Sequence, residues 1–309
     1  MAQLEVAFIV LNYNTYNKTK RCIESCLKQK NIKAKIVLID NHSTDGSFER
    51  LSDEFTGRVQ AIQYPTNYGY AKANNLCMQQ CYDEKIPFCF ILNSDTELVG
   101  EELTRHLLDA FELDAHIAVS APYIYDVTEK GNKLNSNDSR YLRMLRNFGI
   151  LPKLRKLDDQ HTMVSEAHGA AFIIKSEVFK KVGGLEESYF MYGEESHMCK
   201  KIQQMNHVLL WYQNTSEYVL HHHDTSGSLE EWRIMLNGRN RTLEYYEERK
   251  KAPIRWTLVF GATCFALKSY SNSKPYFRGV KIARELHRIH ASKEEILNNA
   301  LLIRNGEGK

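Results

Sequence analysis

The chain has 309 residues, of which 43% are hydrophobic, and its formal net charge is +3. This length is enough for one large α/β domain, or for a domain with a smaller appendage. A charge so close to neutral does not indicate nucleic-acid binding, and we expect no nucleic acid partner.

The cysteines and the apolar runs bear on the compartment. The seven cysteines lack the paired spacing of secreted disulfide frameworks, which indicates a reducing environment. The N-terminus runs directly into a predicted strand, so we expect no signal peptide. The longest uncharged apolar run, residues 256–267, is too short to span a bilayer. These features predict a cytoplasmic protein.

The first predicted strand, residues 6–11, is a continuous apolar run typical of the interior of a parallel sheet. It ends at Asn12 and Tyr13, and a predicted helix follows. A dinucleotide-binding Rossmann unit would need a Gly-x-Gly-x-x-Gly turn here, and the sequence has none. A polar and aromatic turn can instead hydrogen-bond to a nucleobase and stack on it.

Three further predicted strands also end in polar residues. Residues 36–39 lead to Asp40, residues 59–64 to the segment 67–75, and residues 88–92 to Asn93, Ser94 and Asp95. Strands alternating with helices predict an α/β fold with a mostly parallel sheet and helices on both faces. Ligands of such a sheet lie beyond the carboxyl ends of its strands. Asp95 there suits Mg²⁺ or Mn²⁺, which prefer oxygen ligands; alternatively it caps a helix or solvates a turn.

The second half of the chain continues this alternation. We expect a helix at residues 100–113, strands at 117–125 and 168–174, and a helix at 176–182. Between them, residues 126–161 are polar and only weakly periodic, which predicts a mobile lid or acceptor loop, or else a solvated insertion. The basic residues of this segment are Arg140, Arg143, Arg146, Lys153, Arg155 and Lys156.

The strand ends carry four motifs in a fixed order: Val-Ala-Phe-Ile-Val-Leu-Asn-Tyr-Asn, Val-Leu-Ile-Asp-Asn-His-Ser-Thr-Asp-Gly-Ser, Asn-Tyr-Gly-Tyr-Ala-Lys-Ala-Asn-Asn and Leu-Asn-Ser-Asp-Thr. In these motifs the chain resembles a family 2 glycosyltransferase with the GT-A fold, and most of all the branch that includes bacterial rhamnosyltransferases of cell-surface polysaccharide assembly. The resemblance covers residues 6–228. It implies a GT-A catalytic domain at 1–228, with a nucleotide-sugar half up to about residue 115 and an acceptor half from about 116, followed by a helical extension at 229–309.

The resemblance also implies roles for individual residues. Asn93-Ser94-Asp95 stands in for the family's Asp-x-Asp, with Asp95 as the acid that binds Mn²⁺ or Mg²⁺. Because the first acid is Asn here, metal affinity would depend partly on the phosphates of the nucleotide. The implied nucleotide-sugar contacts are Asn12, Tyr13, Asp40, Asn67, Gly69, Asn75, Asn93 and Ser94.

Two later segments would complete the site. Glu194 and Glu195 resemble the family's acidic pair at a helix start, whose second acid is the general base; that acid is more often Asp, and His197 stands where the family often has another acid. One of the histidines at 221–223 matches the family's metal or diphosphate ligand, and we favour His222, with His223 almost as good. We expect Asp40, Asp95, Glu195 and a histidine to converge on one cleft.

The predicted function is therefore inverting, metal-dependent transfer of a sugar from a dTDP- or UDP-sugar to a hydroxyl of a glycan or lipid-linked oligosaccharide. One alternative is a catalytically silent homologue that binds nucleotide sugar. Another is a sugar-1-phosphate nucleotidyltransferase, although residues 12–18 lack the glycines that a triphosphate-binding loop needs.

The tail combines apolar residues with basic ones between positions 253 and 290. This pattern predicts an in-plane helix or hairpin on the cytoplasmic membrane face, or instead a homodimer interface or a helix packed on the core. Upstream, Arg239 and Arg241 could face a phosphate or a lipid headgroup, or could be solvated helix positions.

Overall fold

The computed structural model describes residues 4–128, 131–135, 154–222, 230–248 and 270–306. The chain divides into two compact units. The first comprises Met1–Leu185 and Met198–Thr225, and the second comprises Glu186–His197 and Ser226–Lys309. The second unit therefore contains a segment, Glu186–His197, that the sequence-based division had placed in the catalytic domain.

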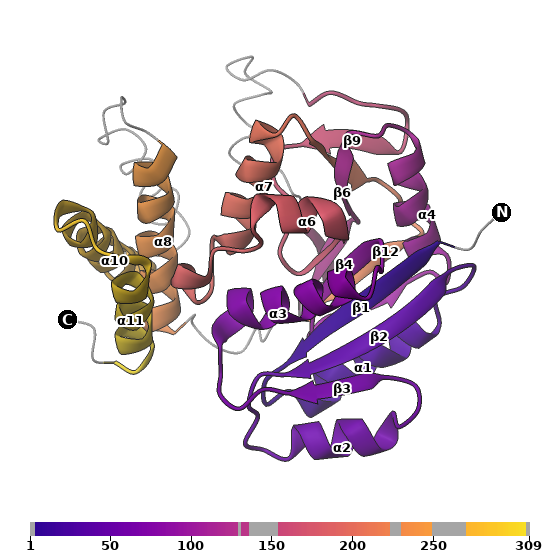
Figure 1. The fold of residues 1–309 in the computed structure, drawn as a ribbon, viewed down its shortest axis with the longest axis horizontal. Coiled ribbons are helices and arrows are strands. Elements are labelled where there is room, and N and C mark those ends of the chain that lie inside the picture. Colours follow the sequence, from indigo (N-terminus) through magenta and orange to yellow (C-terminus); the bar gives the residue numbers. More distant parts are fainter. Residues whose placement is uncertain (1–3, 129–130, 136–153, 223–229, 249–269, 307–309) are drawn as a thin grey trace. The chain divides into compact units, whose positions relative to one another are not determined.

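The first unit is built on an eight-stranded sheet in the order β3-β2-β1-β4-β10-β6-β11-β9 (Figure 1). Neighbouring strands are parallel except where β10 and the edge strand β9 are involved. The predicted mostly parallel sheet is confirmed. Its strands are β1 (Glu5–Asn12), β2 (Lys33–Asp40), β3 (Gln60–Gln63), β4 (Phe88–Asn93), β6 (Ile117–Ala121), β9 (His161–Val164), β10 (Ala171–Lys175) and β11 (Val208–Tyr212).

Helices cover both faces of this sheet, as predicted. Side chains of a strand point alternately to its two faces, so Val6, Phe8 and Val10 join one buried cluster, and Ala7 and Ile9 join the other. The first cluster includes helices α1 (Tyr16–Leu27), α2 (Ser47–Glu54) and α4 (Leu103–Asp109), after which a 3₁₀ turn (Ala110–Glu112) ends the predicted 100–113 helix. The second cluster includes α3 (Gly69–Asp83), α6 (Ser176–Val182) and the part of α7 (Glu194–Gln204) from Met198 onwards. Cys22 and Cys26 of α1 are buried in the first cluster, and Cys77 and Cys81 of α3 are buried in the second.

The prediction of one strand over residues 117–125 is wrong. The segment forms β6 and then β7 (Ile124–Thr128), which belong to different sheets. Pro122 lies between them, and because proline has no N–H it cannot continue a ladder of hydrogen bonds. Strand β7 joins a four-stranded sheet with β5 (Thr96–Val99), β8 (Gly131–Asn135) and β12 (Tyr218–His221).

Strand β8 also shows that the predicted 126–161 loop is partly regular, because it pairs with β7 in an antiparallel hairpin. Within the same segment the structure describes Arg155 and Lys156, and both are exposed. Arg140, Arg143, Arg146 and Lys153 lie outside the described residues, so the proposed lid is not tested there.

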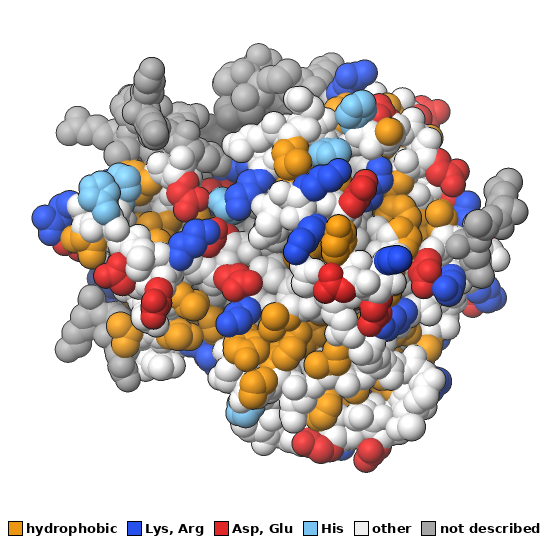
Figure 2. Space-filling model, viewed as in Figure 1, with side chains coloured by type: hydrophobic (Ala, Val, Ile, Leu, Met, Phe, Trp, Pro, Cys, Tyr) orange, Lys and Arg blue, Asp and Glu red, His pale blue; other side chains and the backbone are white. Residues whose placement is uncertain are grey.

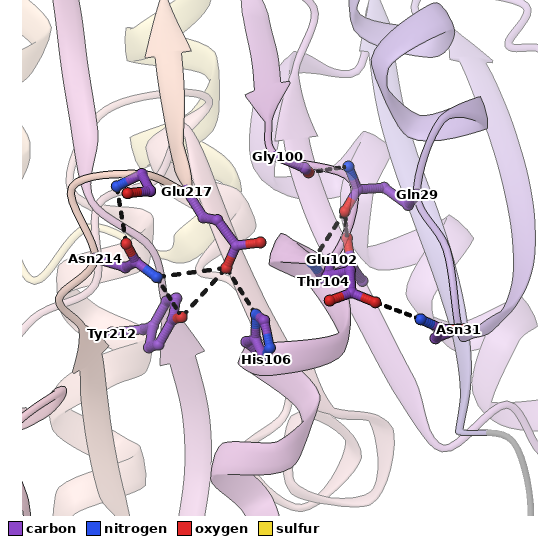
Figure 3. A network of polar contacts seen from close by, with 10 residues as sticks. Gln29, Asn31, Gly100, Glu102, Thr104, His106, Tyr212, Asn214 and Glu217 are labelled. Carbon is purple, nitrogen blue, oxygen red and sulfur yellow. Dashed lines mark hydrogen bonds and ion pairs between the residues drawn. The ribbon is translucent and has the colours of Figure 1, made fainter.

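A polar network joins the start of β12 to helix α4 (Figure 3). The Glu217 carboxylate lies 2.7 Å from His106 Nδ1 and accepts a hydrogen bond of 3.3 Å from the Tyr212 hydroxyl. Gly100, which follows β5, has a φ of +95°, and a Cβ built there would lie 2.7 Å from Glu217 Cγ. The absence of a side chain at position 100 therefore lets Glu217 reach His106.

We predict that Gly100→Ala lowers the free energy of unfolding by about 1–3 kcal/mol, because it combines an unfavourable φ with a steric clash. Gly57→Ala is the matched control: its φ of +76° is also positive, but nothing lies within 4 Å of the added Cβ. Urea unfolding of both variants measures the difference. Equal losses would show that the contact with Glu217 does not constrain position 100.

The second unit is helical, as the predicted extension required. Its elements among the described residues are the 3₁₀ turn η2 (Glu187–Tyr189), the first residues of α7, α8 (Glu231–Glu248), α10 (Tyr270–Arg288) and α11 (Lys293–Arg304). Helix α11 begins with a capping box formed by Ser292 and Glu295. Within the part of the chain that the structure describes, no helix is both long and apolar enough to cross a membrane. On the face shown in Figure 2, acidic and basic side chains are interspersed, in keeping with the small net charge.

Candidate active site

The carboxyl ends of β1 and β2 are joined by a buried polar network. Asn12 and Asp40 are opposite each other in the ladder, and both are fully buried. The Asn12 amide donates to Asp40 Oδ1 at 2.7 Å and to the hydroxyls of Ser43 and Ser47, while its carbonyl oxygen accepts from Thr19 at 2.6 Å. Asn12 therefore fixes the two turns rather than presenting its amide to solvent.

Asp40 accepts four hydrogen bonds. Oδ1 accepts from Asn12 and from the Ser43 hydroxyl, and Oδ2 accepts from the Ser43 backbone N–H at 2.8 Å and from Gln63 Nε2 at 3.2 Å. A carboxylate has about four acceptor sites, so these donors satisfy it. A base N–H could reach Asp40 only by replacing a donor, and the bond from Gln63 is the longest. Beside this network Tyr13 is 40% exposed, which leaves its ring accessible for stacking.

The loop before α3 is also tied to β2. Asn41, which follows Asp40, donates to Asn67 Oδ1 and to Gly69 O and accepts from Tyr68 N–H. Asn67 and Gly69 thus lie beside the Asp40 turn, and their contact with a nucleotide sugar stays a prediction. Asn75 lies further along α3. Its side-chain amide donates a hydrogen bond to Leu185 O, and its side-chain oxygen accepts one from the Leu185 N–H. That pairing gives Asn75 a clear role in holding the turn after α6.

The end of β4 places Asp95 at the same edge of the sheet. Asn93 is beside Leu11 of β1, and Ser94 accepts a hydrogen bond of 3.1 Å from Thr15, so this turn is linked to the Asn12 turn. The backbone oxygen of Asp95 accepts from the N–H of His222 at 2.7 Å. The Asp95 side chain is 23% exposed, so its carboxylate is open to solvent while its backbone is fixed.

His221, rather than the favoured His222, has its ring against Asp95. Its Nε2 lies 3.2 Å from Asp95 Oδ1, and its Nδ1 lies 3.3 Å from Oδ1 of Asp126 on β7. Burial would lower the pKa of His221, but hydrogen bonds to Asp126 and Asp95 outweigh it and raise that pKa to about 9. The imidazole is therefore cationic at neutral pH, between two carboxylates.

The other two histidines are placed differently. His222 Nε2 lies 2.9 Å from Glu97 Oε2, and His223 lies outside the described residues. The sequence analysis named His221 only as one of three candidates, behind His222 and His223, and it missed Asp126. Pairing of β12 with β5 and β7 decides which histidine faces Asp95, and the alternation of side chains along β12 was the one signal in the sequence that bears on it.

Asp95, Asp126 and His221 supply some, but not all, of the ligands that a divalent cation would need. Carboxylate oxygens and an imidazole nitrogen are ligands that Mn²⁺ accepts. Among the described residues, however, there is no group of three or more His, Cys, Asp or Glu side chains arranged to hold a metal ion. An ion held at Asp95 would take further oxygen ligands from a bound diphosphate, and ligation by His221 would require loss of its proton.

Glu194 and Glu195 are the first two residues of α7 and belong to the second unit. Acidic side chains at a helix N-terminus are stabilised by the helix dipole. Glu194 is 4% exposed, and burial together with the charge of Glu195 raises the pKa of Glu194 well above its ordinary value. Close by, His197 Nε2 lies 2.9 Å from Glu247 Oε2.

The loop leading to this acidic pair is held by α8. Phe190 and Tyr192 have backbone φ angles of +65° and +72°, which residues other than glycine rarely adopt. The Asn240 amide donates to three carbonyls of the loop: Tyr189 O at 3.1 Å, Met191 O at 2.9 Å and Tyr192 O at 2.8 Å. Sequence reasoning missed Asn240, because no local pattern links it to a loop about 50 residues away.

Both readings of Arg239 were wrong, because its side chain is fully buried. It donates to Asn240 Oδ1 at 2.9 Å and to Ile296 O at 2.7 Å, so it joins α8 to α11. Burial lowers the pKa of Arg239 to about 9, which still leaves it cationic at neutral pH. Arg241 is exposed and donates to Asn237 at 3.1 Å, as expected of a solvated helix position.

We predict that Asn240→Ala destabilises the protein by about 1–3 kcal/mol, because three carbonyls of the loop lose their donor. The midpoint of urea unfolding measures this loss. Asn237→Ala, one turn earlier on α8, is the control, since among the described residues Asn237 bonds only to the exposed Arg241. If the two variants unfolded at the same urea concentration, Asn240 would not be the residue that holds the loop.

Comparison with known proteins gives consistent matches. The model of the family described as "Glycosyl transferase family 2" matches residues 7–183. The chain is 26% identical over 203 residues to the "Low-salt glycan biosynthesis hexosyltransferase Agl10" of Haloferax volcanii, covering 65% of this chain and 62% of that protein. It is 30% identical over 128 residues to "Glycosyltransferase GlyG" of Streptococcus pneumoniae, covering 40% of this chain and 41% of that one. The chain thus spans less than two thirds of these relatives.

Two solved structures share the fold. One is GalNAc-T7 with UDP, GalNAc and Mn²⁺, with a TM-score of 0.58 and 18% identity, covering 82% of this chain and 52% of that chain. The other is the mannosyltransferase PcManGT from Pyrobaculum calidifontis in complex with GDP-Man and Mn²⁺, with a TM-score of 0.58 and 14% identity, covering 99% and 75%. At these identities the similarity is one of fold.

Proposed function

Because the chain belongs to glycosyl transferase family 2, we propose that it transfers a sugar from a pyrimidine nucleoside diphosphate, dTDP or UDP, to a hydroxyl group with inversion at the anomeric carbon. The GT-A fold predicted from the sequence is confirmed. The finer similarity to rhamnosyltransferases stays a prediction. One observation carries the proposal: the polar ends of β1, β2 and β4 form one linked edge that ends at the solvent-accessible Asp95.

The donor would lie along this edge. The exposed ring of Tyr13 offers a stacking surface for the base, and Asp40 would accept a base N–H in exchange for the bond from Gln63. Asn12, Asn67 and Gly69 would act by holding these turns in place. The two structural relatives were solved with UDP and GDP-Man, so the identity of the base is a central point of the test.

The diphosphate end would meet Asp95 and His221. Asp95, with Asn93 and Ser94 beside it, would hold Mn²⁺ or Mg²⁺ against the diphosphate, and such an ion supplies charge stabilisation for the leaving group. The cationic His221, fixed by Asp126, would add a second positive charge there. Both structural relatives were solved with Mn²⁺, which supports this assignment.

The acceptor would be activated by Glu195. As general base it would remove the proton from the acceptor hydroxyl as that oxygen attacks the anomeric carbon. The glycan-biosynthesis relative supports a glycan acceptor. We propose further that the acceptor is a glycan or a lipid-linked oligosaccharide, and that the protein acts in the cytoplasm in peripheral contact with the membrane.

A thermal-shift screen tests the donor directly. The full chain is mixed with Mn²⁺ and with dTDP-, UDP- or GDP-sugars, and a ligand at about 100 times its Kd is expected to stabilise it by about 2.7 kcal/mol. The proposal expects stabilisation by a dTDP- or UDP-sugar that depends on Mn²⁺, followed by transfer to an acceptor. A response only to GDP-sugars would contradict the pyrimidine assignment, and no response to any donor would contradict the function.

A further inference from the structure

Helix α10 separates its residues sharply into a buried and an exposed face. Tyr276, Val280, Ala283 and Leu286 are buried at between 0% and 9% exposure. On the same side, a Cβ added to Gly279 would lie 2.0 Å from Met235 O, so the backbones of α10 and α8 are in close contact. Packing against α8 therefore fixes which side of α10 faces outward within this unit.

The outward face is strongly basic. Successive residues of a helix are 100° apart, and this spacing places the exposed basic residues on one side of α10, opposite the residues packed on α8. Only one acid, Glu285, lies among them, and it pairs with Arg288. Within the described residues no ion pair involves the other four cations. The exposed basic residues are Lys274, Arg278, Lys281, Arg284 and Arg288.

Two apolar side chains lie on the same face. Phe277, which lies between Lys274 and Arg278, is 45% exposed, and Ile289, which directly follows the last residue of α10, is 53% exposed. From Lys274 to Arg288 the face is about 21 Å long. A helix face that carries several cations and an exposed aromatic ring fits a flat anionic surface, because long basic side chains reach headgroup phosphates while the ring enters the interface.

We propose that the outward face of α10 docks the protein on a bilayer that contains anionic phospholipid. Charge complementarity favours this partner over a second copy of the chain, since two such faces would repel each other. The proposal does not depend on the sugar-transfer activity, because docking requires neither donor nor acceptor.

Co-sedimentation of the full chain with vesicles tests this proposal. We expect binding to phosphatidylglycerol and phosphatidylcholine mixed at about 1:2, none to phosphatidylcholine alone, and release by salt as the Debye length falls from about 10 Å at 0.1 M to about 3 Å at 1 M. In Arg278→Gln/Lys281→Gln the partition coefficient should fall about 30-fold, from about 1 kcal/mol for each charge. Both positions are exposed, and unchanged thermal unfolding would confirm that the variant folds.

The control is Arg21→Gln/Lys28→Gln, which removes the same charge from exposed positions in the first unit and should bind like the unmodified protein. Equal binding to both kinds of vesicle would overturn the proposal, as would equal losses in the two variants. It would also be overturned if the α10 variant lost self-association in sedimentation velocity while the unmodified chain bound no vesicles.

Discussion

Glu195→Gln is expected to lower kcat for sugar transfer by about 10²–10⁴-fold, the usual contribution of a general base. Gln has nearly the shape of Glu but cannot accept the acceptor's proton. Because Glu195 would act only on the acceptor hydroxyl, the Kd for the donor should stay unchanged. Transfer assays with saturating donor, together with calorimetric titration of the donor, measure the two quantities.

Glu194→Gln is the matched control, since it makes the same change at the neighbouring position. Burial and the charge of Glu195 raise the pKa of Glu194 and so disfavour its charged form, and replacing it by a neutral amide should therefore lower kcat much less. A larger effect at Glu194 than at Glu195 would reverse the two assignments. Full activity in both variants would exclude the acidic pair from the chemistry.

Asp95→Asn is expected to lower kcat/KM by about 10²–10³-fold, comparable to the loss of one preorganised group that stabilises transition-state charge. The loss should be accompanied by loss of the Mn²⁺-dependent part of donor binding. Titration of the donor with and without Mn²⁺ measures this dependence. If Asn at position 95 retained Mn²⁺-dependent binding, the ion would be held elsewhere.

The histidines allow a sharper comparison at the same place. His221 contacts Asp95, whereas His222 contacts Glu97, so His221→Ala should lower kcat/KM far more than His222→Ala. The opposite order would restore the assignment favoured by the sequence. Glu97→Gln separates the two further, because it removes the partner of His222 without touching Asp95.

The sequence by itself determined the α/β fold, the family and the polar ends of the first strands. Apolar runs of four to six residues alternating with amphipathic helices fix such a sheet locally, because burial on both faces demands continuous hydrophobic strands. The same local pattern placed Asp40 and Asp95 at strand ends, and the structure links those ends through Asn12, Thr15 and Ser94. That Glu195 joins them in one cleft stays a prediction.

Tertiary structure decided what depends on contacts between distant residues. Adjacent histidines are equivalent in sequence, and only the pairing of β12 with β5 and β7 turns His221 towards Asp95 and Asp126. Arginine side chains are usually exposed, yet Arg239 is buried, because backbone carbonyls and an Asn side chain supply hydrogen-bond acceptors for its guanidinium. A side chain's partners across the fold, rather than its chemical type, determine whether burying its polar atoms is stable.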